Sequence, residues 1–273
     1  MIVYYFFKGD KKYQVKKLNR TYAGRSTQYK TNQNLSMKIY DFDIKKGIYS
    51  FGLNELKTES HSHPVVEVIS ATNGTFSLQS NGRTNENLVF AIIKSNTEHK
   101  VVSKDSSIRM LMVESHNFQL YDFLGKEGIE FQNGVFSASS FAKKDALFSE
   151  VKKLAVTKDL KTPTDKRISE CIKFIEENEL EYKNLVSELT SKVLLSSSRL
   201  SHLFKAHIGI SIKKYLVWNR LRQAIHLYLT KENNLTDVSL QSGFFDQAHL
   251  TNSFKNVLGV RPSTAYNSRI LQA

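Results

Sequence analysis

The feature that most constrains the fold of this chain is an internal repeat in its last third. Residues 185–209 and 235–259 carry the same apolar positions, at an offset of 49 residues that becomes 50 partway through. The corresponding pairs are Val186 and Leu235, Leu189 and Val238, Leu200 and Leu250, Phe204 and Phe254, and Gly209 and Gly259. The extra residue of the second copy, Phe245, falls in the turn. A repeat that absorbs its length change in a turn keeps its helices, so the pattern predicts two helix-turn-helix units.

A predicted helix over residues 211–229 connects the two units. At about 1.5 Å per residue its length is roughly 28 Å. Successive major grooves on one face of DNA are about 34 Å apart. The connecting helix is therefore of the right order to hold two recognition helices one DNA turn apart, and double-stranded DNA is the predicted partner.

Both predicted recognition helices have a polar face opposite their apolar one. The candidate DNA contacts are Ser198, Arg199, Ser201, His202 and Lys205 in the first, Arg220 in the connecting helix, and Gln247, Ala248, Thr251, Asn252 and Lys255 in the second. Side-chain amides can pair with adenine, and small apolar groups can contact the thymine methyl group. The second unit offers more such groups, so we expect it to discriminate bases more strongly. On the connecting helix, Lys213, Lys214 and Arg222 are either phosphate contacts or solvated charges.

The charge distribution agrees with DNA binding by the C-terminal part of the chain. Residues 182–273 hold 12 basic and 4 acidic side chains, and residues 1–46 hold 11 and 3. Residues 47–164 are neutral, with 13 of each. A basic repeat beside a neutral middle is expected if one half meets phosphates and the other does not. The basic N-terminal arm is equally explained by a solvated surface.

The first half of the chain is predicted to be an antiparallel β-structure. From about residue 49 to 115, short runs alternate between apolar and polar positions and are separated by turn residues, including Asn73-Gly74 and Asn81-Gly82. Helical spacing begins near Ser140. The predicted fold class is two-domain α+β, with an N-terminal β-sandwich or barrel followed by helices, and a C-terminal all-α domain whose two helix-turn-helix motifs are joined by a long helix.

Three predicted domains follow from these patterns. Residues 1–125 form the β-domain with its basic arm, 126–164 a helical dimerisation segment and linker, and 165–273 the DNA-binding domain. The predicted helix caps are Thr164 or Asp165, Asn184, Ser196, Ser211 and Asp246, with Gly209 and Gly259 closing the two recognition helices.

Histidines and one carboxylate gather in the predicted β-domain. His61, His63 and Glu67 share strand parity, and His99 lies on a later strand that can bring it alongside. Three imidazoles and a carboxylate suit zinc, nickel, manganese or iron. Three interpretations stay open: an effector pocket lined partly by these residues, a bound divalent metal, and a purely structural cluster.

The C-terminal residues resemble the DNA-binding domain of AraC/XylS-type transcriptional regulators. The resemblance covers about 100 residues and rests on Ser196–Ala224 and Leu235–Tyr266, with Gly243, Asp246 and Pro262 among its specific positions. It implies a seven-helix domain with tandem helix-turn-helix units, usually joined to a sensor and dimerisation domain. Here Thr190 and Ser239 replace the small residue, commonly alanine, of each supporting helix, and Asn252 stands where many members have arginine.

The stretch from His61 to Gly74 similarly resembles the first cupin motif, and sensors of the AraC family are often cupin-like. The second cupin motif is weaker, because Lys94 and Asn96 stand where proline and glycine are usual. The resemblance therefore implies a cupin-like sensor domain, which fits the predicted β-sandwich or barrel.

The sequence thus predicts a ligand-responsive transcription regulator that is not an enzyme and binds promoter DNA in two successive major grooves. The resemblance to AraC/XylS-type regulators implies that it acts as an activator. The expected partners are a small-molecule effector, a second copy in a homodimer and RNA polymerase, with no membrane. One cysteine, Cys171, and no targeting segment favour the cytoplasm. The alternative is a cupin-type metalloenzyme or metal sensor that carries an accessory DNA-binding domain.

Overall fold

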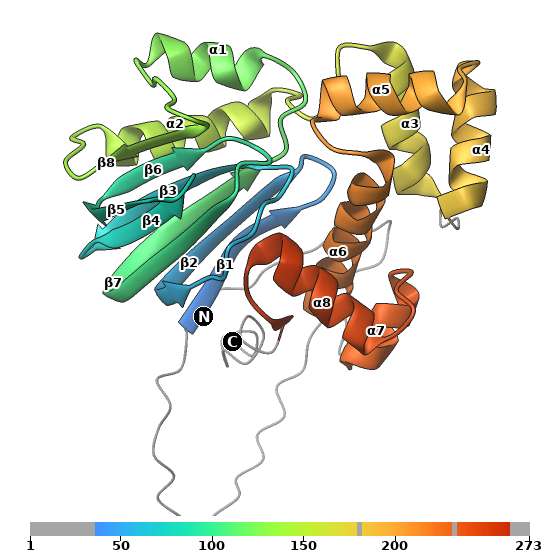
Figure 1. Cartoon of the computed structure of the whole chain (residues 1–273). Helices are drawn as coiled ribbons and strands as arrows, with labels where there is room; N and C mark the ends of the chain where they lie inside the picture. The colour runs from blue at the N-terminus through green and yellow to red at the C-terminus, as the bar shows by residue number, and fades with distance from the viewer. Residues whose placement is uncertain (1–35, 179–181, 231–233, 263–273) are drawn as a thin grey trace, which may run out of the picture. The chain divides into compact units, whose positions relative to one another are not determined.

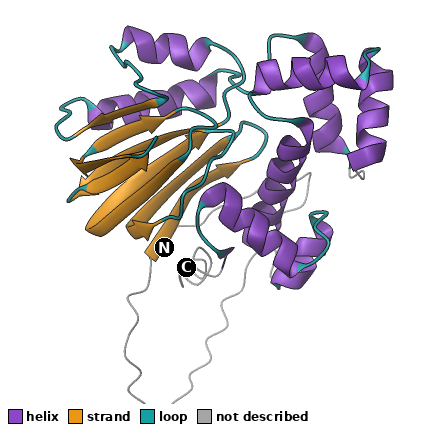
Figure 2. Cartoon of the chain, in the orientation of Figure 1, coloured by secondary structure: helices purple, strands orange, loops and turns teal. Residues whose placement is uncertain are grey.

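The computed structural model describes residues 36–178, 182–230 and 234–262. Its first part is an eight-stranded antiparallel sheet and its second part is helical (Figure 2). The strands are β1 Ser36–Asp43, β2 Ile48–Lys57, β3 Val66–Asn73, β4 Phe76–Ser80, β5 Arg83–Leu88, β6 Phe90–Ile93, β7 His99–Val113 and β8 Val135–Ala138. This arrangement confirms the predicted two-domain α+β class.

The long strand β7 organises the sheet (Figure 1). The strand order is β1-β2-β7-β3-β6-β8, and β4 pairs with the first half of β7 and with β5. The alternating runs at residues 98–103 and 108–114 predict two separate strands, whereas β7 runs through both without a break. Asp105, at a φ of 52°, lies between its two halves. β1 begins at Ser36, inside the stretch assigned to the basic arm, whose residues 1–35 lie outside the described part of the chain.

The two predicted hairpin turns have different outcomes. Asn81 and Gly82 both have positive φ and join the paired strands β4 and β5, which confirms this hairpin. Asn73-Gly74 joins β3 to β4, but these two strands pair with different halves of β7 rather than with each other. The prediction of a hairpin there is wrong, because β7 is long enough to bind both strands.

The alternation of side chains divides the sheet into two apolar faces. On β7, Leu111 and Val113 belong to one buried cluster, and Met110 and Met112 belong to the other. Helices α1 Gln119–Lys126 and α2 Lys144–Thr157 pack on the first face, with Val151 fully buried. The segment 126–164, predicted for dimerisation, therefore contributes α2 and β8 to the core of the β-domain; its role in dimerisation stays a prediction.

Six described helices form the C-terminal part of the chain. They are α3 Lys166–Glu177, α4 Tyr182–Val193, α5 Ser197–Ile208, α6 Ile212–Thr230, α7 Leu235–Gln241 and α8 Gln247–Leu258. The side chain of Asp165 caps α3 as predicted, whereas Asn184 lies inside α4 and caps nothing. The cap of α7 is Asn234, because its side chain accepts the Asp237 amide hydrogen. A seventh helix would fall on residues outside the described ranges.

A buried ion pair joins the sheet to the long helix α6. Arg222 Nη1 donates to Glu114 Oε1 at 2.6 Å, and both side chains have no exposed surface. Tyr49 and Trp218 also donate to Glu114 Oε1, at 2.5 and 3.2 Å. Burial pushes the pKa of Glu114 up, but the positive charges of Arg222 and Lys161 outweigh it and hold this pKa below its usual range. Arg222 is therefore not a phosphate contact, contrary to one of the interpretations of the sequence.

Removing one partner of this pair leaves the other charge buried and unpaired. We expect Arg222→Ala to lower the free energy of unfolding by about 3–5 kcal/mol, measured by urea titration. The control is Lys213→Ala on the same helix, an exposed side chain whose loss should cost no more than about 0.5 kcal/mol. Equal losses in the two variants would contradict a role for the pair in stability.

Candidate DNA-binding interface and buried histidine cluster

The two predicted recognition helices, α5 and α8, are built alike. Each has 12 residues and begins at a capping side chain: Ser196 accepts the Arg199 amide hydrogen, and Asp246 accepts that of His249. Each ends at a glycine in the left-handed region, Gly209 at a φ of 80° and Gly259 at 71°. The same start and stop signals thus set both helices, as the repeat predicts.

The polar faces of these helices lie at the protein surface. Leu200 and Phe204 of α5, and Leu250 and Phe254 of α8, are buried. The exposed candidates are Ser198, Arg199, Ser201, His202, Lys205, Gln247, Ala248 and Asn252, and the partly exposed ones are Thr251, Lys255 and Arg220. The fold brings all of them to accessible positions, and their contact with DNA stays a prediction.

Two polar contacts bear on the second unit. The Thr236 hydroxyl, on the supporting helix α7, donates to Gln247 Oε1 at 3.1 Å, which holds that amide at the start of α8. Arg220 Nε lies 3.0 Å from the position that a Cβ on Gly243 would take. Arg220 therefore packs against the turn of the second unit, and a side chain at residue 243 would meet it.

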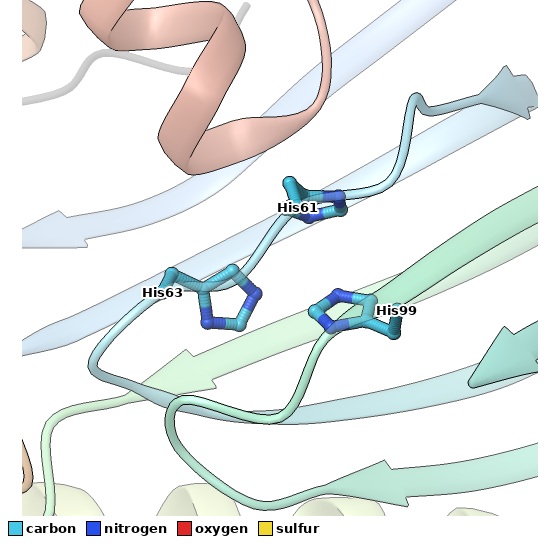
Figure 3. A group of neighbouring side chains, drawn as sticks. All are labelled: His61, His63 and His99. Atoms are coloured by element: carbon cyan, nitrogen blue, oxygen red, sulfur yellow. The ribbon is translucent and has the colours of Figure 1, made fainter. Parts of the chain in front are cut away.

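The four residues predicted to form a site in the β-domain lie close together. His61, His63, Glu67 and His99 are all buried, and Figure 3 shows the three imidazoles turned toward one another. Three ring nitrogens, one from each histidine, lie within 4.8 Å of one another. Glu67 Oε2 is 2.9 Å from His99 Nε2 and 3.3 Å from His63 Nε2. The backbones of His61 and His99 exchange two hydrogen bonds, which hold the strand segments together.

Backbone carbonyls select one tautomer for each ring. The Nδ1 atoms of His61, His63 and His99 lie 2.9, 3.1 and 2.8 Å from the carbonyl oxygens of Glu59, Val65 and Thr97. A carbonyl only accepts, so each Nδ1 carries a hydrogen and donates it. In a neutral ring this leaves the Nε2 lone pair facing the centre of the cluster. His99 Nε2 is buried and forms no hydrogen bond of acceptable geometry despite its closeness to Glu67.

The surroundings of the cluster lower the pKa of His61 and of Glu67. Burial, reinforced by the neighbouring rings of His99 and His63, lowers the pKa of His61 to about 3, so this ring is neutral at physiological pH. Burial would raise the pKa of Glu67, but the adjacent imidazoles of His63 and His99 outweigh it, so the pKa falls and the carboxylate is charged. A buried anion surrounded by inward-facing imidazole nitrogens is a donor set that fits a divalent cation.

A mainly apolar cavity adjoins the cluster. Its volume is about 100 Å³, and it lies between the second face of the sheet and the helices α6 and α8. The apolar lining includes Phe51, Met110, Met112, Trp218, Phe254 and Leu258. His61, His63 and Glu67 form its polar part. No lysine or arginine is among the described residues that line it.

Sequence analysis missed the residues by which the helical part joins the sensor. Glu114 directly follows the buried end of β7, and no feature of the sequence marks it. Trp218 and Arg222 lie on α6, where buried residues do not form a single face that the sequence pattern could reveal. The one available signal is an arginine within an apolar run, and it has two interpretations until the partner carboxylate is known.

Comparisons with known proteins show what the helical domain is similar to. Residues 189–268 match the family model described as a helix-turn-helix domain. The chain is 32% identical over 109 residues to the arabinose operon regulatory protein of Escherichia coli K12, covering 40% of this chain and 37% of that protein. It is 27% identical over 131 residues to the virulence regulon transcriptional activator VirF of Yersinia enterocolitica, covering 48% and 45%. The chain thus spans less than half of the length of these relatives.

The whole fold also resembles a solved structure. ToxT from Vibrio cholerae O395 matches with a TM-score of 0.51 at 12% identity, covering 83% of this chain and 98% of that one. The same protein bound to (E)-4-(8-methylnaphthalen-1-yl)but-3-enoic acid matches with a TM-score of 0.51 at 13% identity, covering 87% and 98%.

The fold is an antiparallel, cupin-like β-domain followed by a helical domain, and residues 189–268 match a helix-turn-helix domain. Over part of its length, the chain is thus similar to transcriptional regulators such as the arabinose operon regulatory protein. Among the described residues, no helix is both long and apolar enough to span a membrane.

The cap of the second recognition helix can be tested directly. Asp246→Ala removes the acceptor for the His249 amide hydrogen, which lies 2.7 Å away, and should lower the free energy of unfolding by about 1 kcal/mol. Asp246→Asn keeps an acceptor and should stay close to wild type. If urea titration shows the same loss for Asn as for Ala, the charge rather than the cap is responsible.

Proposed function

We propose that the chain is a sequence-specific, DNA-binding transcription regulator that inserts α5 and α8 into successive major grooves. The observation that carries this proposal is the pair of equivalent recognition helices with exposed polar faces. The 19 residues of α6 between them correspond to about 28 Å, close to the spacing of one DNA turn. Action as an activator, as a homodimer and through contact with RNA polymerase is part of the proposal and rests on the resemblance to AraC/XylS-type regulators alone.

The sensor is proposed to bind a small effector in the cavity beside α6 and α8. ToxT binds a naphthalenyl butenoic acid in the structure of that complex. Here the cavity has no basic lining residue among those described, and a buried carboxylate is part of its wall. A neutral, mainly apolar effector suits this lining better than an acid. Because about 100 Å³ is below the usual range of ligand pockets, binding must move the helices that close the cavity.

That movement would link the effector to DNA. Trp218 and Ile225 of α6, and Phe254 and Leu258 of α8, line the cavity directly. An effector that enlarges it favours states in which these helices are displaced from the sheet. The positions of both recognition helices would change with them.

The second candidate function is a cupin-type metalloenzyme with an accessory DNA-binding domain. It rests on the histidine cluster, and the small cavity argues against it, since a substrate pocket is usually several times larger. Turnover of a substrate with bound metal, lost in His63→Ala while DNA binding persists, would favour it.

The role of the second recognition helix predicts unequal effects of matched variants. Asn252→Ala should weaken binding to a selected DNA site by about 1–3 kcal/mol and relax base preference under α8, because an amide that reads adenine is lost. His202→Ala, the equivalent position of α5, should cost less.

Gel shifts at fixed salt on genomic fragments selected by the wild-type protein would measure both losses. The control is Gln241→Ala, an exposed amide at the end of the supporting helix α7. Equal losses at residues 252 and 202 would contradict the inequality of the two units. The absence of any specific retention would contradict DNA recognition itself.

The cavity proposal is tested with the neutral fluorescent probe Nile red. Met112→Phe adds volume to the lining, so the affinity for the probe should fall several-fold while wild-type affinity for DNA without the probe is kept. Val156→Phe, on the exposed surface of α2, is the control for added apolar area. Equal probe binding by all three proteins would place the probe elsewhere.

A further inference from the structure

The C-terminal end of α8 rests on the loop that carries His61. The Glu59 amide donates to the Gly259 carbonyl oxygen at 2.8 Å. A Cβ added at Gly259 would lie 2.5 Å from His61 Nδ1 and 2.8 Å from the Glu59 carbonyl oxygen. The glycine that ends the second recognition helix thus packs directly against the histidine ring.

The equivalent end of α5 approaches the loop that leads to His99. A Cβ added at Gly209 would lie 2.6 Å from Asn96 Nδ2. The Asn96 amide in turn donates to the His63 carbonyl oxygen at 2.8 Å. The loop of His61 therefore contacts Gly259 at the end of α8, and the loop that leads to His99 contacts Gly209 at the end of α5. These two glycines are equivalent positions of the repeat.

The histidine cluster has the features of a metal site. Each ring donates its Nδ1 hydrogen to a backbone carbonyl, which is how proteins orient metal-bound imidazoles. Two nitrogens bound to one zinc ion at about 2.1 Å can be at most about 4.2 Å apart. The three ring nitrogens here lie within 4.8 Å of one another, so small side-chain rotations that close the widest pair by up to about 0.6 Å bring all three within reach of one ion. The Glu67 carboxylate adds a fourth donor and a negative charge beside two of the rings.

We propose that His61, His63 and His99, with Glu67, bind one divalent transition metal ion, and that the ion fixes the loops against which both recognition helices end. The metal ties His61 and His63 on one loop to His99 at the end of the other. The positions of Gly259 and Gly209 on these loops become fixed at the same time. The coupling to DNA rests on the proposed DNA-binding function, whereas the metal site does not.

We expect the bound metal to raise the affinity for DNA, because it fixes the loops before DNA binds. The reading faces of α5 and α8 are exposed while both helices rest on the loops. Fixing the loops therefore lowers the entropy cost of placing both helices on DNA, and metal tightens DNA binding. Linkage requires that DNA tighten metal binding by the same factor, typically about 5-fold or more for coupled sites.

The metal site is tested on the full chain, without a histidine tag, by equilibrium dialysis against Zn²⁺, Ni²⁺ and Mn²⁺ followed by elemental analysis. We expect one ion per chain for at least one of these metals, and its loss in both His63→Ala and His99→Ala. His226→Gln, which changes an exposed histidine of α6, should retain the ion. A closed four-donor site should hold one ion per chain. Binding of less than about a tenth of that amount with all three metals would overturn the site.

The coupling is tested with the same proteins by gel shift with and without the bound metal. Wild type should bind a selected fragment about 5-fold more tightly with metal, and His99→Ala should bind equally in both conditions. Asn96→Gly removes the side chain beside Gly209 and suits the positive φ of 63° at that position. It should keep the ion but lose much of the metal effect.

The outcomes separate the two proposals. DNA binding that is unchanged by a stoichiometric ion overturns the coupling and leaves DNA recognition intact. An ion that binds in the absence of any specific DNA retention overturns the proposed function and with it the coupling, while the metal site stands. A full metal effect in Asn96→Gly overturns the role assigned to the contact at Gly209.

Discussion

The ion pair between Glu114 and Arg222 is the contact on which the joining of the two domains depends. Both groups are removed from water, and an unpaired charge there would be several kcal/mol less stable. Glu114 Oε1 also accepts from Tyr49 and Trp218, so one carboxylate oxygen collects donors from strand β2 and helix α6. Since α6 connects α5 to the α7–α8 unit, the β-domain holds the element that links the two helix-turn-helix units.

The histidine cluster and the ion pair act on different parts of the reading domain. The ion pair holds α6, whereas the loops around His61 and Asn96 contact the ends of α8 and α5. The apolar cavity lies between these contacts and has walls from both domains. In the proposed function, a ligand in the cavity and a metal in the cluster would therefore both act on the spacing of α5 and α8, which has to match the spacing of two major grooves.

Local signals in the sequence predicted the helices of the C-terminal helical domain well. Ser196 and Asp246 cap the recognition helices, and Gly209 and Gly259 end them, because these preferences depend on a few neighbouring residues. The predictions that failed depended on distant partners. Asn184 lies inside α4, Asn73-Gly74 joins strands that pair elsewhere, and Arg222 is buried against a carboxylate 108 residues away.

The sequence by itself determined the two-domain class, the repeat and the ends of its recognition helices. Those features follow from hydrophobic periodicity and capping, which are local and repetitive. It also named the four residues of the histidine cluster, but the predicted reason, a shared strand face, was wrong, because His61 and His63 precede β3 in a loop. The tertiary structure alone decided that Glu114 holds α6, that the histidine loops contact Gly209 and Gly259, and that a cavity lies beside them. Such contacts join residues far apart in the chain, so they depend on how complete surfaces pack rather than on any pattern along the sequence.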